Sequence, residues 1–336
     1  MKTVFFELEG WEESIVREKL PGFDIVIAPG TMEACADPQA FDAEIAVVFV
    51  DSRVTGEVLA KFPNLKFVAT RSTGYDHIDL AACKARGIRV AFVPGYGDNT
   101  VAEFAFGLIL NLTRNIYQAI DRVKETRSFS LEGLRGTDIK GKTLGVIGAG
   151  RIGREAIRIG KGFGMRIVAY DLKPDAAKAV DLGFEYLGLP ELLAASDVIT
   201  IHCPYTPETR HLLNQSNLSA VKRGAYLVNT ARGGIVETAA LIEALKNGTL
   251  AGAALDVVEE EGEMKDEMKF LSANPHADDL KTILENHALM SLPNVLVTPH
   301  NAFNSKEALE RILGTTLSNI ESFAKGSPFA EVPESR

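Results

Sequence analysis

Short apolar runs alternate with amphipathic stretches along most of this chain. Such alternation of strand-like and helix-like patterns predicts an α/β fold with a mainly parallel sheet. The alternation begins at the N-terminus and starts again at residue 143, so the sequence predicts two α/β units in series. The predicted strands cover residues 3–8, 24–28, 45–50, 66–70 and 89–93 in the first unit, with helices such as 12–20 and 56–62 between them, and residues 143–147, 166–170, 198–202, 225–229, 253–258 and 295–298 in the second.

Two longer stretches carry apolar residues at helical spacing. Residues 99–127 exceed the length of an ordinary globular helix and predict one long helix that bridges the two domains. Residues 128–142, with three glycines, then form the connection into the second unit. Residues 305–325 follow the last predicted strand and predict an amphipathic helix that returns to the first domain.

A glycine fingerprint separates the first two strands of the second unit. Gly148, Gly150 and Gly153 follow strand 143–147, and Asp171 ends the next strand. In a dinucleotide-binding βαβ unit the first glycine permits the tight turn, the second lets the backbone approach a pyrophosphate, and the third allows close packing of helix and strand. The helix N-terminus offers free amides to the phosphates, and the acidic residue holds the ribose diol. The sequence therefore predicts a dinucleotide site here.

The composition limits the class of protein. A length of 336 residues suits two domains, and 46% hydrophobic with 24% charged residues is typical of a soluble globular protein. No apolar run is long enough to cross a bilayer and the N-terminus lacks a signal-peptide pattern, so we expect a cytoplasmic protein without membrane partners. The net charge of −9 disfavours nucleic acid as a partner. Three widely spaced cysteines predict free thiols and neither disulfides nor a metal site; they are Cys35, Cys83 and Cys203.

Two side chains at predicted strand ends could act on a 2-hydroxy acid. Arg232 follows strand 225–229, and its guanidinium could bind a carboxylate at two points, although it could also form a structural ion pair or contact a phosphate. His300 follows strand 295–298 at the strand C-terminus, where open α/β sheets bind ligands, and a neutral imidazole can accept the hydroxyl proton as hydride leaves. His202 also ends a strand, but the Cys203-Pro204 that follows it indicates a loop beside the cofactor. The other competitors are His77, His211, His276 and His287.

A carboxylate beside His300 would stabilise the charged imidazolium. The acidic run 259–261, which follows the predicted strand 253–258, is the natural source. The alternative interpretation is a solvated loop. If Glu263 is included, most of these four acids must be exposed to solvent whichever one contacts His300.

Together these motifs resemble the D-isomer-specific 2-hydroxyacid dehydrogenase family, most closely its D-lactate dehydrogenase branch. The resemblance covers nearly the whole chain. It depends on the segments 71–79 (RSTGYDHID), 93–96 (VPGY), 101–103 (VAE), 148–153 (GAGRIG), 202–204 (HCP), 229–233 (NTARG), 255–257 (LDV) and 298–303 (TPHNAF).

The resemblance implies two doubly wound parallel-sheet α/β domains. Residues 1–98 plus 301–336 would form a flavodoxin-like substrate-binding domain, and residues 99–300 an inserted Rossmann domain that binds NAD and makes most of a homodimer interface. The resemblance further implies that Arg232 binds the substrate carboxylate, that His300 is the acid/base and that Glu261 is its partner.

The resemblance also assigns binding residues. Those implied for the cofactor are Gly148, Gly150, Arg151, Ile152 and Gly153 at the pyrophosphate, Asp171 at the ribose, His202, Cys203, Pro204 and Thr209 along its flank, and Thr230, Ala231, Arg232 and Asp256 near the nicotinamide. Those implied for the substrate are the amides of Thr73 and Gly74, the side chains of Tyr96 and Phe303, and Arg232 and His300.

The sequence departs from the family pattern at two positions. Val258 replaces a common aromatic residue and Gly262 replaces a frequent proline, so the catalytic glutamate could be Glu260 or Glu261. Counting from Asp256 and Arg232 favours Glu261. Residues 262–292 form a longer stretch than in many relatives, which we expect to be a helical excursion at the domain edge.

The predicted function is NAD-dependent interconversion of a 2-oxo acid and its D-2-hydroxy acid, with pyruvate and D-lactate as the best candidates. The charge of Asp171 would repel a 2′-phosphate, which favours NAD over NADP. Glyoxylate, hydroxypyruvate or a bulkier 2-oxo acid is the alternative substrate. A further alternative is an NAD-sensing binding protein like the corepressors that resemble this family, but such a protein would not need Arg232, Glu261 and His300 together.

Overall fold

The computed structural model describes residues 1–261 and 277–333. The chain divides into two compact units, one formed by Met1–Tyr96 with Ser305–Arg336 and the other by Gly97–Asn304. The sequence predicts boundaries after residues 98 and 300. We call the two compact units unit 1 and unit 2.

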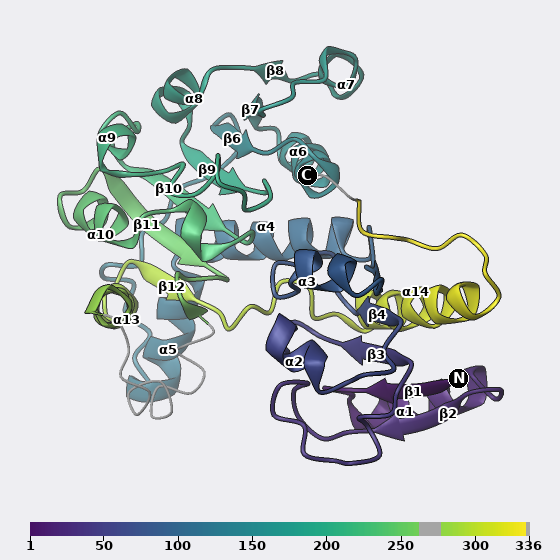
Figure 1. The fold of residues 1–336 in the computed structure, drawn as a ribbon. Coiled ribbons are helices and arrows are strands. Elements are labelled where there is room, and N and C mark those ends of the chain that lie inside the picture. The colour runs from purple at the N-terminus through teal and green to yellow at the C-terminus, as the bar shows by residue number, and fades with distance from the viewer. Residues whose placement is uncertain (262–276, 334–336) are drawn as a thin grey trace. The chain divides into compact units, whose positions relative to one another are not determined.

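Unit 1 contains a five-stranded parallel sheet with the order β2-β1-β3-β4-β5 (Figure 1). This is the strand order of a flavodoxin-like, doubly wound fold, as predicted. Its elements are β1 (Lys2–Phe5), α1 (Gly10–Lys19), β2 (Asp24–Ile27), β3 (Ile45–Val48), α2 (Gly56–Ala60), β4 (Phe67–Thr70), α3 (Leu80–Ala85), β5 (Arg89–Ala91) and α14 (Lys306–Ala324).

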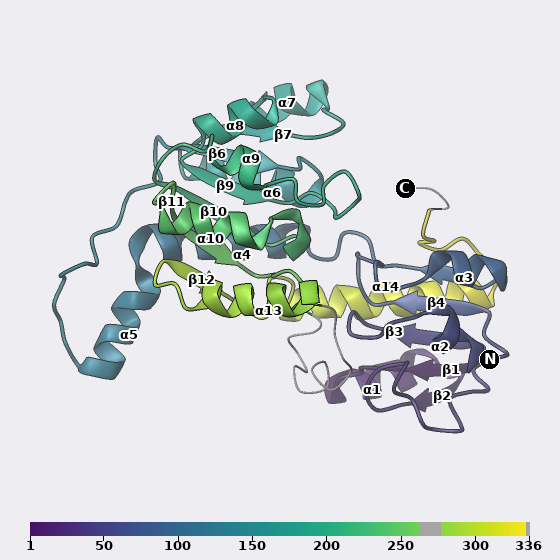
Figure 2. The ribbon, with the colours of Figure 1, turned by 60° about the vertical axis from the view of Figure 1, so that its left-hand side comes forward.

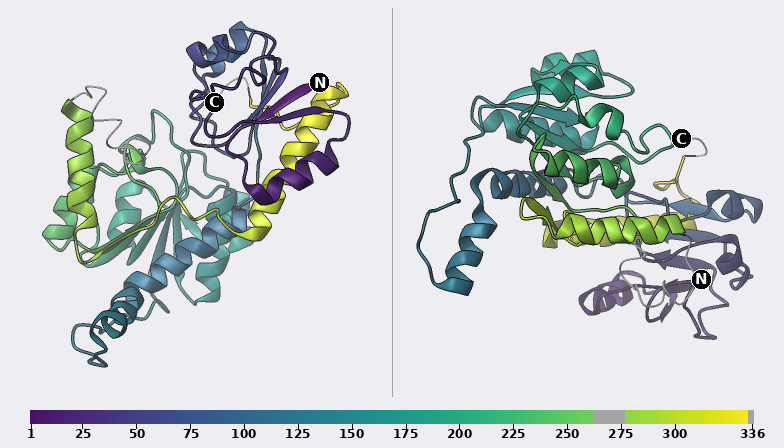
Figure 3. Two further views of the ribbon diagram at one scale, coloured as in Figure 1. Left: turned by 90° about the horizontal axis from the view of Figure 1, so that it is seen from below. Right: turned by 90° about the vertical axis from the view of Figure 1, so that its left-hand side faces the viewer.

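Alternate side chains of these strands fill two separate cores. On one face of the sheet Val4 and Ala46 pack in a cluster with Leu59 of α2. On the other face Phe5 packs in a cluster with residues of α1 and with Leu317 of α14. Figure 3 shows α14 beside α1 on that face. The C-terminal helix α14 therefore packs on the sheet of unit 1. Because helices cover both faces of this sheet, its strands have unbroken apolar sequences.

Unit 2 contains a seven-stranded parallel sheet with the order β12-β11-β10-β9-β6-β7-β8 (Figure 2). The direction of strand addition reverses between β6 and β9, and ligands bind at the carboxyl ends of strands at such a switch point. Its elements are α4 (Asp98–Arg114), α5 (Ile116–Thr126), β6 (Thr143–Ile147), α6 (Arg151–Gly162), β7 (Arg166–Tyr170), α7 (Ala176–Leu182), β8 (Glu185–Tyr186), α8 (Leu189–Ala195), β9 (Val198–Ile201), α9 (Gln215–Leu218), β10 (Ala225–Asn229), α10 (Thr238–Lys246), β11 (Leu250–Leu255), α13 (Ala277–Met290) and β12 (Val295–Val297).

Helices cover both faces of this sheet too. Phe106 of α4 and Ile157 of α6 pack into the core on one face. Leu192 of α8, Leu241 of α10 and Leu289 of α13 pack into the core on the other. Unit 2 is therefore a doubly wound Rossmann fold, as predicted.

The single long helix predicted over residues 99–127 is wrong. The structure has two helices, α4 and α5, separated by Asn115 in the left-handed region at φ 51° and ψ 41°. Asparagine tolerates this conformation, and the Asn111 side chain accepts a hydrogen bond from the Tyr117 amide at 2.8 Å just past the break. Both helices lie in unit 2, so neither spans the two units as expected. No described helix is both long and apolar enough to cross a membrane.

The loop after β11 starts earlier than predicted. The strand covers Leu250–Leu255 instead of residues 253–258, so Asp256 already lies beyond the strand end. The excursion expected over 262–292 includes the helix α13, while residues 262–276 lie outside the described residues.

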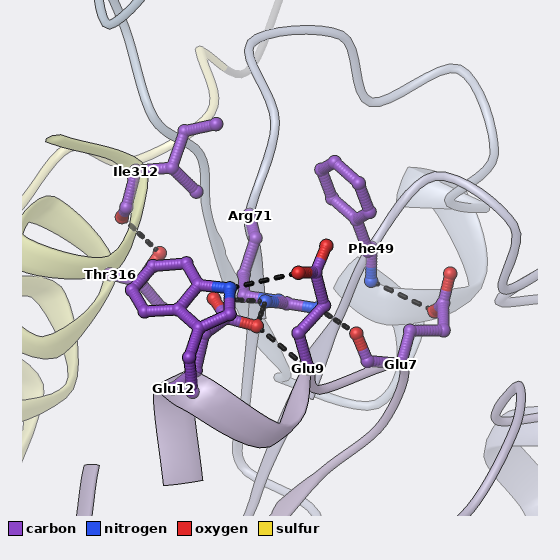
Figure 4. Close-up of polar contacts among 8 residues, drawn as sticks. Glu7, Glu9, Glu12, Phe49, Arg71, Ile312 and Thr316 are labelled. Atoms are coloured by element: carbon purple, nitrogen blue, oxygen red, sulfur yellow. Dashed lines mark hydrogen bonds and ion pairs between the residues drawn. The ribbon is translucent and has the colours of Figure 1, made fainter. Parts of the chain in front are cut away.

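A buried ion pair fixes the carboxyl end of β4 in unit 1 (Figure 4). Arg71 is 4% exposed and Glu12, in the first turn of α1, is 2% exposed. Arg71 Nη1 lies 2.7 Å from both Glu12 carboxylate oxygens, and Nη2 donates to the Glu7 carbonyl. The guanidinium lies over the Phe49 ring, 5.1 Å from its centroid. The loop that begins after Arg71 is therefore tied to α1 and to the end of β1.

Loss of this ion pair should destabilise unit 1. Glu12→Gln leaves Arg71 buried without its counter-charge, which costs about 3–5 kcal/mol of unfolding free energy. Glu13→Gln is the matched control, because Glu13 pairs with Arg17 at the surface and such pairs contribute at most about 1 kcal/mol. Urea unfolding of the two variants measures the difference. Equal loss in both would refute the importance of the buried pair.

Candidate functional site

The glycine turn after β6 permits two close backbone contacts. Gly148 has a φ of 93°, and a Cβ there would lie 2.5 Å from the Cys203 amide nitrogen. A Cβ on Gly153 would lie 2.0 Å from the Gly148 carbonyl oxygen. Both positions thus require glycine, one for the turn against the 202–204 loop and the other for packing of α6.

The N-terminus of α6 presents open amides at this turn. Gly150 is its N-cap and makes no side-chain cap hydrogen bond, and a Cβ there would meet no heavy atom within 4 Å in the described part of the chain. Open space at a helix N-terminus fits a pyrophosphate, since the free amides and the helix dipole favour an anion. Arg151 starts the helix and pairs with Asp98 at 2.7 Å, while Ile152 packs against the core below.

Asp171 lies beside the turn, at the end of β7. One carboxylate oxygen accepts from the Ala149 amide at 2.9 Å, and the other accepts from the Lys173 amide at 2.9 Å. A carboxylate has further lone pairs, so these two contacts orient Asp171 and leave acceptor capacity for a ribose diol.

The 202–209 loop borders the glycine turn. The His202 amide donates to the Ile147 carbonyl at 2.7 Å, and its ring Nε2 lies 3.0 Å from Thr200 Oγ1. Its Nδ1 is buried with no hydrogen-bond partner among the described residues. Burial lowers the pKa of His202 to about 4. Burial, helped by the charge of Asp171, raises the pKa of Cys203 to about 12, so this thiol stays protonated at neutral pH.

Thr209 closes that loop from within. It is buried, and its hydroxyl donates to the Pro204 carbonyl at 2.7 Å and accepts from the Thr206 amide at 2.7 Å. Thr209 thus shapes the loop, while Pro204 is exposed on it.

Asn229 holds the loop that carries Arg232. Its side-chain amide donates to the Arg232 carbonyl at 2.9 Å and accepts from the Ala231 amide at 3.0 Å. Thr230 Oγ1 is buried and has no partner within the described residues. An orphaned hydroxyl beside the sheet edge is a group that a polar ligand such as NAD could satisfy. Arg232 Nη1 donates to the Ala231 carbonyl at 2.8 Å, and its side chain is half-buried.

Gly233 brings this loop against the next one. A Cβ at Gly233 would lie 2.0 Å from the Val258 carbonyl carbon and 2.3 Å from the Glu259 amide nitrogen. The loops after β10 and β11 therefore touch through their backbones, directly between Arg232 and the acidic run.

The acidic run supplies a carboxylate to His300. His300 Nδ1 lies 2.7 Å from Glu261 Oε1, and the two side chains are 26% and 32% exposed. A carboxylate accepts only, so Nδ1 donates and the opposite nitrogen, Nε2, is available to a substrate. Of the two glutamates considered from the sequence, Glu261 and not Glu260 makes this contact. His300 has a φ of 50°, a strained conformation of the kind that occurs at functional sites.

Asp256 fixes the His300 loop from below. It is 1% exposed, and its carboxylate accepts from Thr298 Oγ1 at 2.5 Å and from the amides of Asn301 and Ala302 at 2.8 Å each. Its carbonyl accepts from the His300 amide at 2.8 Å. Burial raises the pKa of Asp256 despite these donors. The aspartate expected near the nicotinamide thus also anchors the loop that carries His300.

Phe303 lies beside the imidazole. Its ring centroid is 6.3 Å from that of His300, at an interplanar angle of 78°. The half-buried aromatic ring limits the space next to His300.

The remaining predicted residues lie in unit 1, on the loops after β4 and β5. Thr73 is exposed and its hydroxyl donates to the Val93 carbonyl at 2.7 Å. The Ser72 hydroxyl donates to the Gly74 carbonyl at 2.6 Å. These contacts use the Thr73 side chain and the Gly74 carbonyl, not the backbone amides assigned to the substrate. The Tyr96 carbonyl accepts from Arg311 Nε at 2.6 Å.

Sequence reasoning assigned no role to two residues that build this site, Asn229 and Gly233. Asn229 and Gly233 stand on either side of Arg232 in a motif already singled out, so their proximity was the available signal.

Comparison with known proteins identifies the family. Residues 106–302, more than half of the chain, match the model of the D-isomer specific 2-hydroxyacid dehydrogenase NAD binding domain. The chain belongs to this family. It is therefore an NAD-dependent 2-hydroxyacid dehydrogenase, as predicted from the motifs.

Relatives cover most of this dehydrogenase. The D-lactate dehydrogenase of Escherichia coli is 41% identical over 310 residues, which are 92% of this chain and 90% of that protein. The structure of a D-lactate dehydrogenase from Aquifex aeolicus, complexed with NAD and lactic acid, has a TM-score of 0.85 and 37% identity, covering 96% of each chain. The aromatic 2-oxoacid reductase of Clostridium sporogenes is 40% identical over 265 residues, which are 77% of this chain and 76% of that protein.

The dehydrogenase should lose stability in acid partly through His202. Because its pKa is about 4 instead of 6.5, the unfolded chain binds a proton between these pH values and the folded protein does not. The unfolding free energy should therefore fall as pH decreases through that window, by on the order of 3 kcal/mol from this group. His202→Gln should remove this dependence, and His287→Gln, at an exposed position of α13, is the control. Urea unfolding at several pH values measures the unfolding free energy of each variant. If the difference in unfolding free energy between His202→Gln and wild type is the same at every pH, the lowered pKa of His202 is contradicted.

Proposed function

We propose that this enzyme interconverts pyruvate and D-lactate with NAD. The relatives from E. coli and A. aeolicus support this substrate pair. The observation that carries the proposal is the His300–Glu261 contact at 2.7 Å, which gives the NAD-binding unit an oriented acid/base. The location is proposed to be cytoplasmic, because the three cysteines are free thiols, and cell fractionation would test it.

His300 exchanges the proton in this proposal. In reduction, the protonated imidazole gives the Nε2 proton to the oxygen of the forming alkoxide, and in oxidation neutral Nε2 takes it back. Glu261, which accepts from Nδ1, keeps the ring oriented and stabilises the imidazolium. NAD, when bound, accepts or supplies the hydride.

Arg232 fixes the substrate carboxylate. Its planar guanidinium can donate two parallel hydrogen bonds to a carboxylate, which orients one face of the carbonyl carbon. We also assign Thr73, Gly74 and Tyr96 of unit 1, and Phe303, to substrate binding. Phe303 beside the imidazole favours a small substrate side chain.

The residues around the glycine turn fit NAD. The open amides at Gly150 and the Arg151 side chain would hold the pyrophosphate, and Asp171 the ribose diol. The orphaned hydroxyl of Thr230 and the buried Nδ1 of His202 would gain partners from the bound cofactor.

Reduction of a bulkier 2-oxo acid is the second candidate. The aromatic 2-oxoacid reductase of C. sporogenes, at 40% identity, supports it. Reduction of glyoxylate or hydroxypyruvate is a third candidate from the sequence, and no observation favours it.

A panel of 2-oxo acids with NADH separates these candidates. We expect pyruvate to give a higher kcat/KM than glyoxylate, hydroxypyruvate and phenylpyruvate, because the Phe303 ring limits the space for a large side chain. Oxidation with NAD should accept D-lactate and not L-lactate. NADPH should be poorer than NADH, since Asp171 repels the 2′-phosphate. The measurement is the absorbance of the reduced cofactor. A higher kcat/KM for phenylpyruvate than for pyruvate would contradict the proposal and favour the second candidate.

Removal of the acid/base should slow turnover strongly and keep cofactor binding. His300→Gln should lower kcat by about a hundredfold to ten-thousandfold, the usual range for a general acid/base. The NADH dissociation constant, from fluorescence titration, should change little. His287→Gln makes the same substitution on α13 and should keep the wild-type kcat. Unchanged kcat in His300→Gln would remove this residue from the mechanism.

We further propose that two copies of the chain form a dimer through unit 2. Every residue of α5 is at least partly exposed, and Tyr117 and Ile120 are exposed apolar positions on it. Phe129 and Leu131 follow, 86% and 83% exposed. Monomeric proteins seldom expose so many large apolar side chains together, and a second copy is the simplest cover.

Sedimentation tests the dimer. The wild type should sediment as a dimer, and Ile120→Glu combined with Leu131→Glu should give monomers, because charge cannot be buried unpaired in such an interface. Val180→Glu, an exposed apolar position on α7, is the control and should remain dimeric. A monomeric wild type would contradict the proposal.

A further inference from the structure

A second imidazole–carboxylate pair is formed by His211 and Glu259, which is two residues before Glu261. His211 Nε2 is 2.6 Å from Glu259 Oε1, and the side chains are 34% and 16% exposed. Because a carboxylate only accepts, His211 donates. The other oxygen of Glu259 accepts from the Thr238 amide at 2.9 Å and from Thr238 Oγ1 at 2.6 Å. Three donors therefore bind one largely buried carboxylate. An isolated ion pair at the surface would not have this number of hydrogen bonds.

The backbone of Glu259 is held as well. Its carbonyl accepts from Asn286 Nδ2, on α13, at 2.7 Å. Its amide lies against Gly233, where no Cβ could fit. Residue 259 is thus fixed by the loop after β9, the start of α10, α13 and the Arg232 loop.

His211 is itself held in place. Its φ is 48°, a left-handed conformation that only surrounding contacts keep populated. Its amide donates to the Gly234 carbonyl at 2.8 Å, and its carbonyl accepts from Asn214 Nδ2 at 2.9 Å. The imidazole therefore provides Glu259 with a donor in a defined position.

The chain turns sharply between Glu259 and Glu261. Glu260 has a φ of 52°, so the direction in which Glu261 leaves the turn depends on where Glu259 is anchored. Glu261 makes the 2.7 Å contact with His300 from the far side of that turn.

We propose that Glu259 and His211 are positioning residues that hold the Glu261 carboxylate against His300 Nδ1 and so determine kcat. This inference rests on the proposed role of His300 and Glu261. If Glu259 is released, Glu261 moves, and misplacement by about 1 Å in such a site can cost on the order of a hundredfold in rate. Neither residue contacts the glycine turn through any hydrogen bond described above, so NADH binding should persist.

The test compares single and double variants with pyruvate and NADH. Glu259→Gln and His211→Leu should each lower kcat by about tenfold to a hundredfold with little change in the NADH dissociation constant. His211→Gln keeps an N–H donor and should recover part of the kcat lost in His211→Leu. Glu243→Gln removes the same charge from an exposed position on α10 and should keep the wild-type kcat.

Non-additivity gives the decisive readout. In a Glu261→Gln background, Glu259→Gln should change kcat by less than about twofold, because the group that it positions is already lost. A purely structural role would lower kcat by the same factor in both backgrounds. Equal factors, or wild-type kcat in Glu259→Gln and His211→Leu, would overturn the inference.

Failure of the proposed function is recognised separately. If Glu261→Gln and His300→Gln both keep the wild-type kcat, the acid/base assignment fails, and the inference fails with it. If those two variants lose activity but Glu259→Gln does not, the inference alone is overturned.

Discussion

The backbone contact at Gly233 is the constraint on which the arrangement of the candidate site depends. A Cβ at this residue would lie 2.0 Å from the Val258 carbonyl carbon, so only glycine lets the loops after β10 and β11 meet. Parallel strands end at the same edge of a sheet, but their loops need not touch. Here they do, and the contact places the Arg232 loop directly against the acidic segment that includes Glu261.

Three carboxylates after β11 then have different tasks set by their surroundings. Asp256 is buried and holds the His300 loop through three donors. Glu259 joins the β9 loop to the start of α10. Glu261 is partly exposed and accepts a hydrogen bond from His300 Nδ1. One strand end thus supplies three carboxylates with similar chemistry, and they differ in which groups donate hydrogen bonds to them.

The sequence predicts the sheets well because parallel strands buried on both faces have continuous apolar sequences. The fixed spacing of the three glycines also marks the turn after the first strand of unit 2. The sequence predicts Arg232 and His300 because each directly follows such a strand. It does not predict the break at Asn115, since apolar periodicity continues through a residue in the left-handed conformation. It favours Glu261 over Glu260 only by counting from Asp256 and Arg232, and it gives Glu259 no separate role, because acids in one loop are alike until the chain turns and gives each a partner.

The central claim is that Arg232, Glu261 and His300 act on one substrate beside NAD. A crystal structure with NADH and oxamate, an analogue of a 2-oxo acid, tests it most directly. The account predicts the Arg232 guanidinium on the oxamate carboxylate and His300 Nε2 about 3 Å from the oxygen on the adjacent carbon. Oxamate bound away from Arg232, or with Nε2 beyond hydrogen-bond reach, would contradict it.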